Sequence, residues 1–170
     1  MSPDAKLYDY HVHLYGVLTP EDIFELGKER YQDQALQARI RWCEQEFFRV
    51  TGRTLHVADY WRRADGYEQL CRDYLMTEAG DFAIFQAKFN LLIALFGVLD
   101  PRDMSVARHV FTKQMQAGLA GAEYRMVAPL NLSPSEQLQF FNGLCRLAGE
   151  FQQISGGSYQ PSIALSLSRE

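Results

Sequence analysis

The sequence has few cysteines and no excess of positive charge, and each shortage excludes a class of protein. The three cysteines, Cys43, Cys71 and Cys145, lie far apart, whereas zinc ribbons and redox motifs use close cysteine pairs. We therefore expect reduced thiols. The formal net charge of −4 argues against a general nucleic-acid binder, because neutralising phosphates requires a basic surface. Arginines do gather between positions 30 and 72, but carboxylates are mixed among them, which favours a solvated helical surface of mixed charge.

Long hydrophobic runs are also missing. Residues 1–6 lack the charged start and apolar stretch of a signal peptide, and the apolar run at 91–97 is too short to cross a membrane. We therefore expect a cytoplasmic protein with no nucleic-acid or membrane partner. The chain has 170 residues, of which 47% are hydrophobic, enough for one folded domain with a real core. No repeat, low-complexity tract or linker divides it, so we predict one domain over residues 1–170 without an internal boundary.

Apolar spacing and capping signals predict strands and helices in alternation. The expected strands cover residues 7–14, 122–128 and 162–167. The expected helices start at the caps Thr19, Asp81 and Ser133, cover 36–50 and 59–76, and extend from 100–103 to about Gly118. Parallel strands joined by helical crossovers are the natural product of this order, so we predict an α/β fold.

One predicted helix carries a stripe of large apolar side chains. Phe82, Phe85 and Phe89 are followed at the same spacing by Leu92 and Phe96. We interpret this stripe as core rather than as a ligand pocket. A lysine beside it, at position 88, is expected to cover apolar surface with its stem.

The pair His11 and His13 is the most informative feature that the sequence contains. On a β-strand, side chains at i and i+2 point to the same face, so Asp9, His11 and His13 are expected to project together. Two such imidazoles can bind one metal ion, but a catalytic zinc usually takes three protein ligands plus water. Alone, the pair is equally compatible with two polar residues on an edge strand, so the residues that follow it decide between the two interpretations.

Those residues carry a family resemblance. Residues 10–21, YHVHLYGVLTPE, closely resemble the opening motif of the adenosine deaminase family, a His-x-His-Leu-x-Gly segment followed by Pro-Glu. Residues 85–90, FQAKFN, are similar to that family's Phe-Leu-x-Lys-Phe-Asp segment, and residues 122–125, AEYR, to its second-strand Val-Glu-x-Arg segment. The resemblance spans essentially the whole chain, although residues 31–80 match loosely and form a longer connection than is usual in the family.

The resemblance implies a fold and a set of site residues. The implied fold is an incomplete (β/α)₈ TIM-barrel type with three parallel strands and several helices inserted after the first strand, its site lying at the carboxyl ends of the strands. His11 and His13 would be zinc ligands, and Tyr15 and Gly16 would line the substrate side. Tyr15 stands where the family usually has an acidic or small polar residue, so the identity of the substrate stays open.

The family's remaining catalytic residues have no counterpart in this sequence. A third histidine and a glutamate from a His-Ala-Gly-Glu segment are absent, as is an aspartate near a later strand, so we assign no catalytic residue. The other histidines, His56 and His109, stand in different sequence contexts and are interpreted as ordinary surface or core residues. Glu123 and Arg125 share a strand face and are expected to form an ion pair or network at the barrel core.

Three hypotheses follow. In the first, the chain is the N-terminal part of a zinc hydrolase that deaminates a purine nucleoside or a related amine. In the second, it is a non-catalytic protein of the same fold that self-associates to cover its third strand. In the third, a partner chain supplies the rest of the barrel and completes the zinc site.

Overall fold

The computed structural model describes residues 7–76 and 81–166, which fold into two compact units. The first, here called the α/β unit, contains the residues up to Val17 and from Val98 onward. The second, the helical unit, is Leu18–Gly97. All the strands of the described residues belong to the α/β unit, and the helical unit is built from helices alone.

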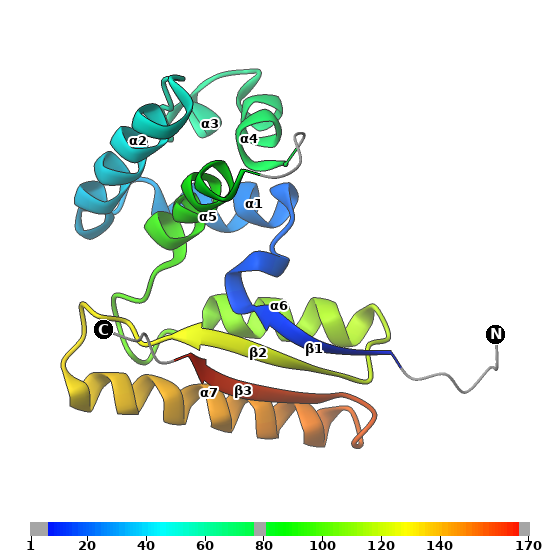
Figure 1. Ribbon diagram of the computed structural model, residues 1–170. Coiled ribbons are helices and arrows are strands. Elements are labelled where there is room, and N and C mark those ends of the chain that lie inside the picture. The colour runs from blue at the N-terminus through cyan, green and yellow to red at the C-terminus, as the bar shows by residue number, and fades with distance from the viewer. Residues whose placement is uncertain (1–6, 77–80, 167–170) are drawn as a thin grey trace. The chain divides into compact units, whose positions relative to one another are not determined.

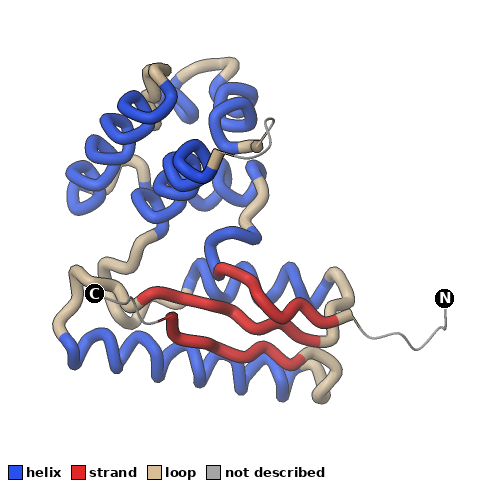
Figure 2. Tube along the Cα trace, viewed as in Figure 1, coloured by secondary structure: helices blue, strands red, loops and turns tan. Residues whose placement is uncertain are grey.

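The α/β unit contains a parallel three-stranded sheet. Its strands are β1 (Tyr8–His13), β2 (Gly121–Val127) and β3 (Gln160–Ser166). The strands lie side by side in the order β1-β2-β3, and both neighbouring pairs are parallel (Figure 2). Its helices are the 3₁₀ helix η1 (Leu14–Val17), α6 (Ser105–Gln116) and α7 (Pro134–Ile154), and α6 and α7 run alongside the sheet (Figure 1). The prediction of an α/β fold with three parallel strands and several helices after the first strand is confirmed.

The two faces of the sheet differ in chemistry. On β2, Tyr124 and Met126 are buried, whereas the alternate residues Glu123 and Arg125 are half-exposed. The ring of Tyr124 lies 4.7 Å from the ring of Phe111 in α6, measured between centroids. At β2, one face of the sheet is therefore apolar and covered by helices, and the opposite face carries a carboxylate and a guanidinium.

Two buried tyrosines form a hydrogen bond on the apolar side of the sheet. The hydroxyls of Tyr124 and Tyr159 lie 2.6 Å apart and both side chains are buried, so one hydroxyl donates to the other. Burial raises the pKa of both phenols, because a buried phenolate would lose its hydration. The pair is therefore neutral and satisfies its own polar groups inside the core.

The helical unit begins with a helix that the sequence predicts closely. Thr19 caps α1 through a capping box with Asp22, and Pro20 occupies the first turn. The next long helix ends at Gly52, whose φ of 68° is the left-handed conformation that glycine adopts most easily. The helices of this unit are α1 (Pro20–Arg30), η2 (Gln34–Leu36), α2 (Gln37–Thr51), α3 (Asp59–Arg62), α4 (Gly66–Tyr74) and α5 (Phe82–Phe96).

The single helix predicted over residues 59–76 is wrong, because the chain forms two helices there. α3 stops after Arg62, and Arg63 has an extended backbone. α4 starts at Gly66, where an added Cβ would lie 2.1 Å from the carbonyl oxygen of Tyr60. This close backbone approach turns the chain between the two helices, and apolar spacing alone does not signal it.

The aromatic stripe on α5 is core in only part of its length. Leu92 and Phe96 are buried, but Phe82 is 74% exposed and Phe85 is 43% exposed. α5 is apolar around nearly its whole circumference, so the spacing of its large side chains does not identify the face that packs against α2.

The helix predicted from residues 100–103 starts later than expected. α6 begins at Ser105, and Asp100 instead accepts hydrogen bonds from the backbone and side chain of Arg102. The side-chain hydrogen bond from Arg102 lowers the pKa of Asp100 to about 2. The predicted stop at Gly118 agrees with its φ of 79°.

The cysteines and the helices bear on two expectations from the sequence, reduced thiols and the lack of a membrane span. The three cysteines are free thiols, and burial raises the pKa of Cys43 to about 12. None of the helices within residues 7–76 and 81–166 is long and apolar enough to cross a membrane.

Candidate metal centre

The two histidines lie at the carboxyl end of β1. His13 is the last residue of the strand, and both imidazoles are exposed. Their ring centroids are 5.6 Å apart and the ring planes meet at 61°. The rings therefore point to the same side of the strand, as the sequence predicts for this pair.

The spacing of the rings fits a shared metal ion. Two imidazoles that bind one tetrahedral zinc through nitrogens at about 2.0–2.1 Å have ring centres roughly 5–5.5 Å apart. The observed separation of 5.6 Å lies close to that range. Within residues 7–76 and 81–166, no group of three or more His, Cys, Asp or Glu side chains comes together. The pair by itself supplies two of the ligands that a zinc site needs.

A bulge in β1 separates Asp9 from this pair. Asp9 aligns with Ala122, whereas His13 aligns with Arg125, and the register shifts between them. Ala122 and Arg125 are an odd number of residues apart, so their strand neighbours belong to opposite faces. The expectation that Asp9 shares the face of His13 is wrong, because one extra residue in β1 reverses the alternation. Asp9 instead accepts the backbone N–H of His11 at 3.3 Å.

The predicted ion pair on β2 is present. The guanidinium of Arg125 lies 3.0 Å from the carboxylate of Glu123, and Arg125 Nε also donates to it at 3.1 Å. The two side chains are 38% and 35% exposed, so the pair is half-exposed rather than buried. Since Arg125 is the neighbour of His13 across the strands, this pair belongs to the same sheet face as the imidazoles. These four residues, His11, His13, Glu123 and Arg125, are called the polar face below.

No family model matches the chain, and no curated protein or solved structure matches it.

The residues expected to line the substrate side follow the histidines directly. Tyr15 and Gly16 belong to η1, which continues from the carboxyl end of β1. Tyr15 is half-buried and Gly16 is exposed. Their place at the end of the first strand is the position that the resemblance implies, and their contact with a substrate stays a prediction.

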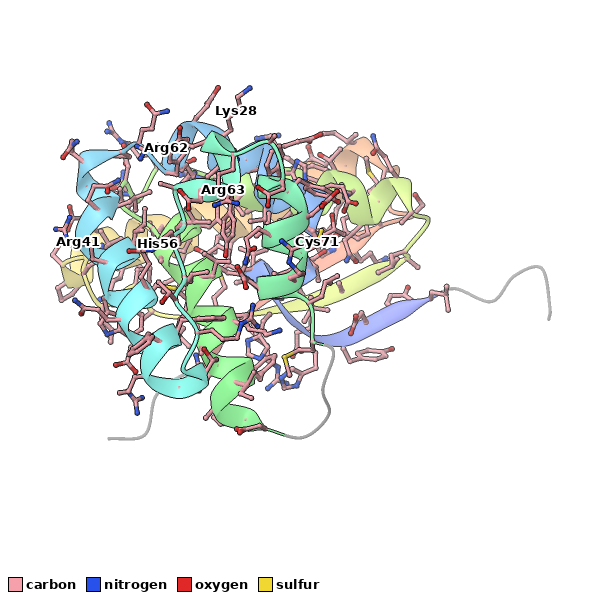
Figure 3. The ribbon with its side chains drawn as sticks, turned by 90° about the horizontal axis from the view of Figure 1, so that it is seen from above. Lys28, Arg41, His56, Arg62, Arg63 and Cys71 are labelled. Carbon is pink, nitrogen blue, oxygen red and sulfur yellow. The ribbon has the colours of Figure 1, made fainter. Side chains whose placement is uncertain are left out.

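His56, His109 and Lys88 belong to elements other than β1 and η1. His56 is exposed in the loop before α3 (Figure 3), and His109 is half-buried in α6. Lys88 is buried in the helical unit, where its amine donates to the carbonyl oxygen of Leu75. The placements of His56 and His109 agree with the surface or core roles that the sequence favoured, whereas Lys88 is buried with its amine hydrogen-bonded rather than covering apolar surface with its stem.

Several arginines of the helical unit lie beside carboxylates. Arg49 lies 2.7 Å from Glu46, and Arg53 lies 2.7 Å from Asp73. Arg63 pairs with Asp65, with 3.0 Å between the guanidinium and the carboxylate. The arrangement agrees with the mixed-charge surface expected from the sequence.

Proposed function

We propose that this chain carries the first metal-binding motif of an adenosine-deaminase-like zinc hydrolase. The complete enzyme would release the amino group of a purine nucleoside or a related heterocycle by hydrolysis. The observation that carries the proposal is the pair of imidazoles, 5.6 Å apart on one face of a strand end, within a sequence motif typical of that family. The localisation proposed with it is the cytoplasm.

The topology of the α/β unit supports the proposal. Its parallel strands follow one another in sequence order, and α6 and α7 cover the same face. A (β/α)₈ barrel repeats this arrangement, with helices outside and functional side chains at the carboxyl ends of the strands. In such a barrel the polar face, with His11 and His13, would become the interior.

Three residues of this chain, His11, His13 and Tyr15, have distinct roles in the proposed site. His11 and His13 would hold the zinc ion, which when bound lowers the pKa of a water molecule and makes it a nucleophile at neutral pH. Tyr15 would border the substrate, where its phenol can donate one hydrogen bond and its bulk narrows the space. The His-Ala-Gly-Glu segment, which would supply the third histidine ligand and the glutamate, does not occur in the 170 residues. The role of this chain in the proposed site is therefore to bind the metal and to line one side of the substrate.

The open sheet favours a second candidate, in which a separate polypeptide completes the site. In the described residues the outer strands β1 and β3 each pair on one side only. Unpaired strand edges readily accept a further strand, either from a second copy or from a different chain. Such a partner would bring the missing ligand and proton donor to the polar face.

The proposal is tested on the protein isolated from its natural source. Zinc content and ammonia release from purine nucleosides are measured together, with a His13→Ala variant and a His56→Ala control. One zinc per chain, and ammonia release that His13→Ala abolishes and His56→Ala preserves, would support the proposal. Activity that depends on a second copurifying polypeptide would identify the completed-site candidate. A protein with neither zinc nor ammonia release would contradict both.

A further inference from the structure

A positive charge stands beside the candidate metal pair. The register of β1 and β2 aligns His13 with Arg125. Neighbouring parallel strands lie about 4.8 Å apart, and residues at aligned positions project to the same face. The guanidinium of Arg125 and the imidazole of His13 therefore share the polar face. The sequence alone does not reveal this neighbour, because the bulge in β1 decides which residue of β2 lies opposite His13.

This guanidinium opposes the binding of a divalent cation. A unit positive charge roughly 7 Å from a dication in a partly hydrated site weakens binding by about ten-fold. An unbalanced Arg125 would consequently make a site of two imidazoles a poor zinc site, since two ligands bind metal weakly from the start.

Glu123 offsets that charge. Its carboxylate lies 3.0 Å from the guanidinium of Arg125 and accepts a hydrogen bond from Arg125 Nε. The hydrogen bond fixes the direction of the arginine side chain, and the negative charge cancels most of its field at the distance of the metal pair. Both side chains are half-exposed, so solvent reduces each effect without removing it.

We propose that Glu123 is a positioning and charge-balancing residue for the metal pair, one that holds and neutralises Arg125 so that His11 and His13 accept a divalent cation. Glu123 is not a ligand in this proposal. The inference rests on the proposed function, since it concerns the affinity of the same metal site.

Charge balance predicts opposite effects for the two partners. In zinc titrations of the full chain by calorimetry at low ionic strength, Glu123→Gln weakens binding about ten-fold. Arg125→Gln strengthens it several-fold, because the unpaired carboxylate then attracts the ion. The double variant returns to within two-fold of the unsubstituted chain. A purely structural role does not produce this change of sign.

A second ion pair of the same unit supplies the control. Arg108 and Glu150 lie 2.8 Å apart on α6 and α7, and their side chains are 52% and 51% exposed. Glu150→Gln should leave zinc affinity unchanged. Circular dichroism spectra of all variants should match that of the unsubstituted chain, which would show that each variant keeps its fold. The effects of the two β2 variants should shrink as salt is raised, because both act through charge.

The outcomes separate the inference from the function on which it rests. Zinc binding by the unsubstituted chain, with both single variants within two-fold of it, would overturn the role of Glu123 and leave the proposed function standing. A chain that binds no zinc at all would overturn this inference together with the first candidate function, and would leave only the candidate in which a partner completes the site.

Discussion

The buried carboxylate of Asp73 is predicted to make a large contribution to the stability of the helical unit. Its side chain is 2% exposed and accepts three hydrogen bonds. Arg53 donates at 2.7 Å, Gln69 donates at 2.7 Å, and the hydroxyl of Tyr60 donates at 3.2 Å. These bonds join the loop after α2 to α3 and α4, so Asp73 connects three segments of the helical unit.

The three donors do not contribute equally. Arg53 is 54% exposed, so it recovers water when the carboxylate is removed and its ion pair adds little. Tyr60 is 1% exposed, so its hydroxyl would be left buried without an acceptor, at about 1–3 kcal/mol. Together with the lost bond from Gln69, Asp73→Ala should lower the free energy of unfolding by about 3 kcal/mol.

Tyr60→Phe is the matched variant, because it removes the donor that would be orphaned. Alone it should cost about 1 kcal/mol, the usual value of one hydrogen bond. Added to Asp73→Ala it should cost nothing, since no hydroxyl is then left unsatisfied, which gives a coupling of about 1 kcal/mol between the sites.

Urea unfolding followed by tryptophan fluorescence measures these differences in the right part of the molecule. Both tryptophans, Trp42 and Trp61, belong to the helical unit. A cost below about 1 kcal/mol for Asp73→Ala, or additive effects of the two substitutions, would refute the reasoning about the buried hydroxyl.

Three further predictions concern other parts of the chain. Gly27→Ala places a Cβ 2.4 Å from the ring of Trp61, and this overlap should outweigh the gain of about 1 kcal/mol in helix propensity, giving a net loss in urea unfolding. Arg102→Gln should raise the pKa of Asp100 from about 2 toward 3.8 in an NMR titration. The stability contributed by that pair is complete above pH 3.8 and is lost as the pH falls through about 2. Cys43, whose pKa is about 12, should escape maleimide labelling at pH 8 until urea unfolds the chain.

Local signals in the sequence predicted much of the fold. Cap residues placed the starts of α1 and α7 at Thr19 and Ser133, and both helices begin there with a capping box, which the sequence predicted at Ser133. These signals are reliable because a cap depends on side chains within three residues of each other. The break between α3 and α4 depends on the approach of Gly66 to the backbone of Tyr60, which periodicity does not encode.

In the candidate site too, the features set by neighbouring residues were predicted and the features set by distant residues were not. The shared face of His11 and His13 followed from strand alternation over two residues, which the structure confirms. The sequence did not predict that Asp9 lies on the other face from His13, because this depends on a bulge in β1. It also did not predict that His13 and Arg125 are neighbours, because this depends on the register of two strands that are far apart in sequence. Register is set by packing across the sheet, so it is the part of a site that a single sequence predicts least well.

The most direct test of the central claim is an NMR titration of the imidazole resonances with zinc. The resonances of His11 and His13 should shift together, with one apparent dissociation constant and one ion per chain, while those of His56 and His109 stay unchanged. Zinc that shifts all four histidines alike, or only one ring of the pair, would contradict the claim that β1 ends in a shared metal site.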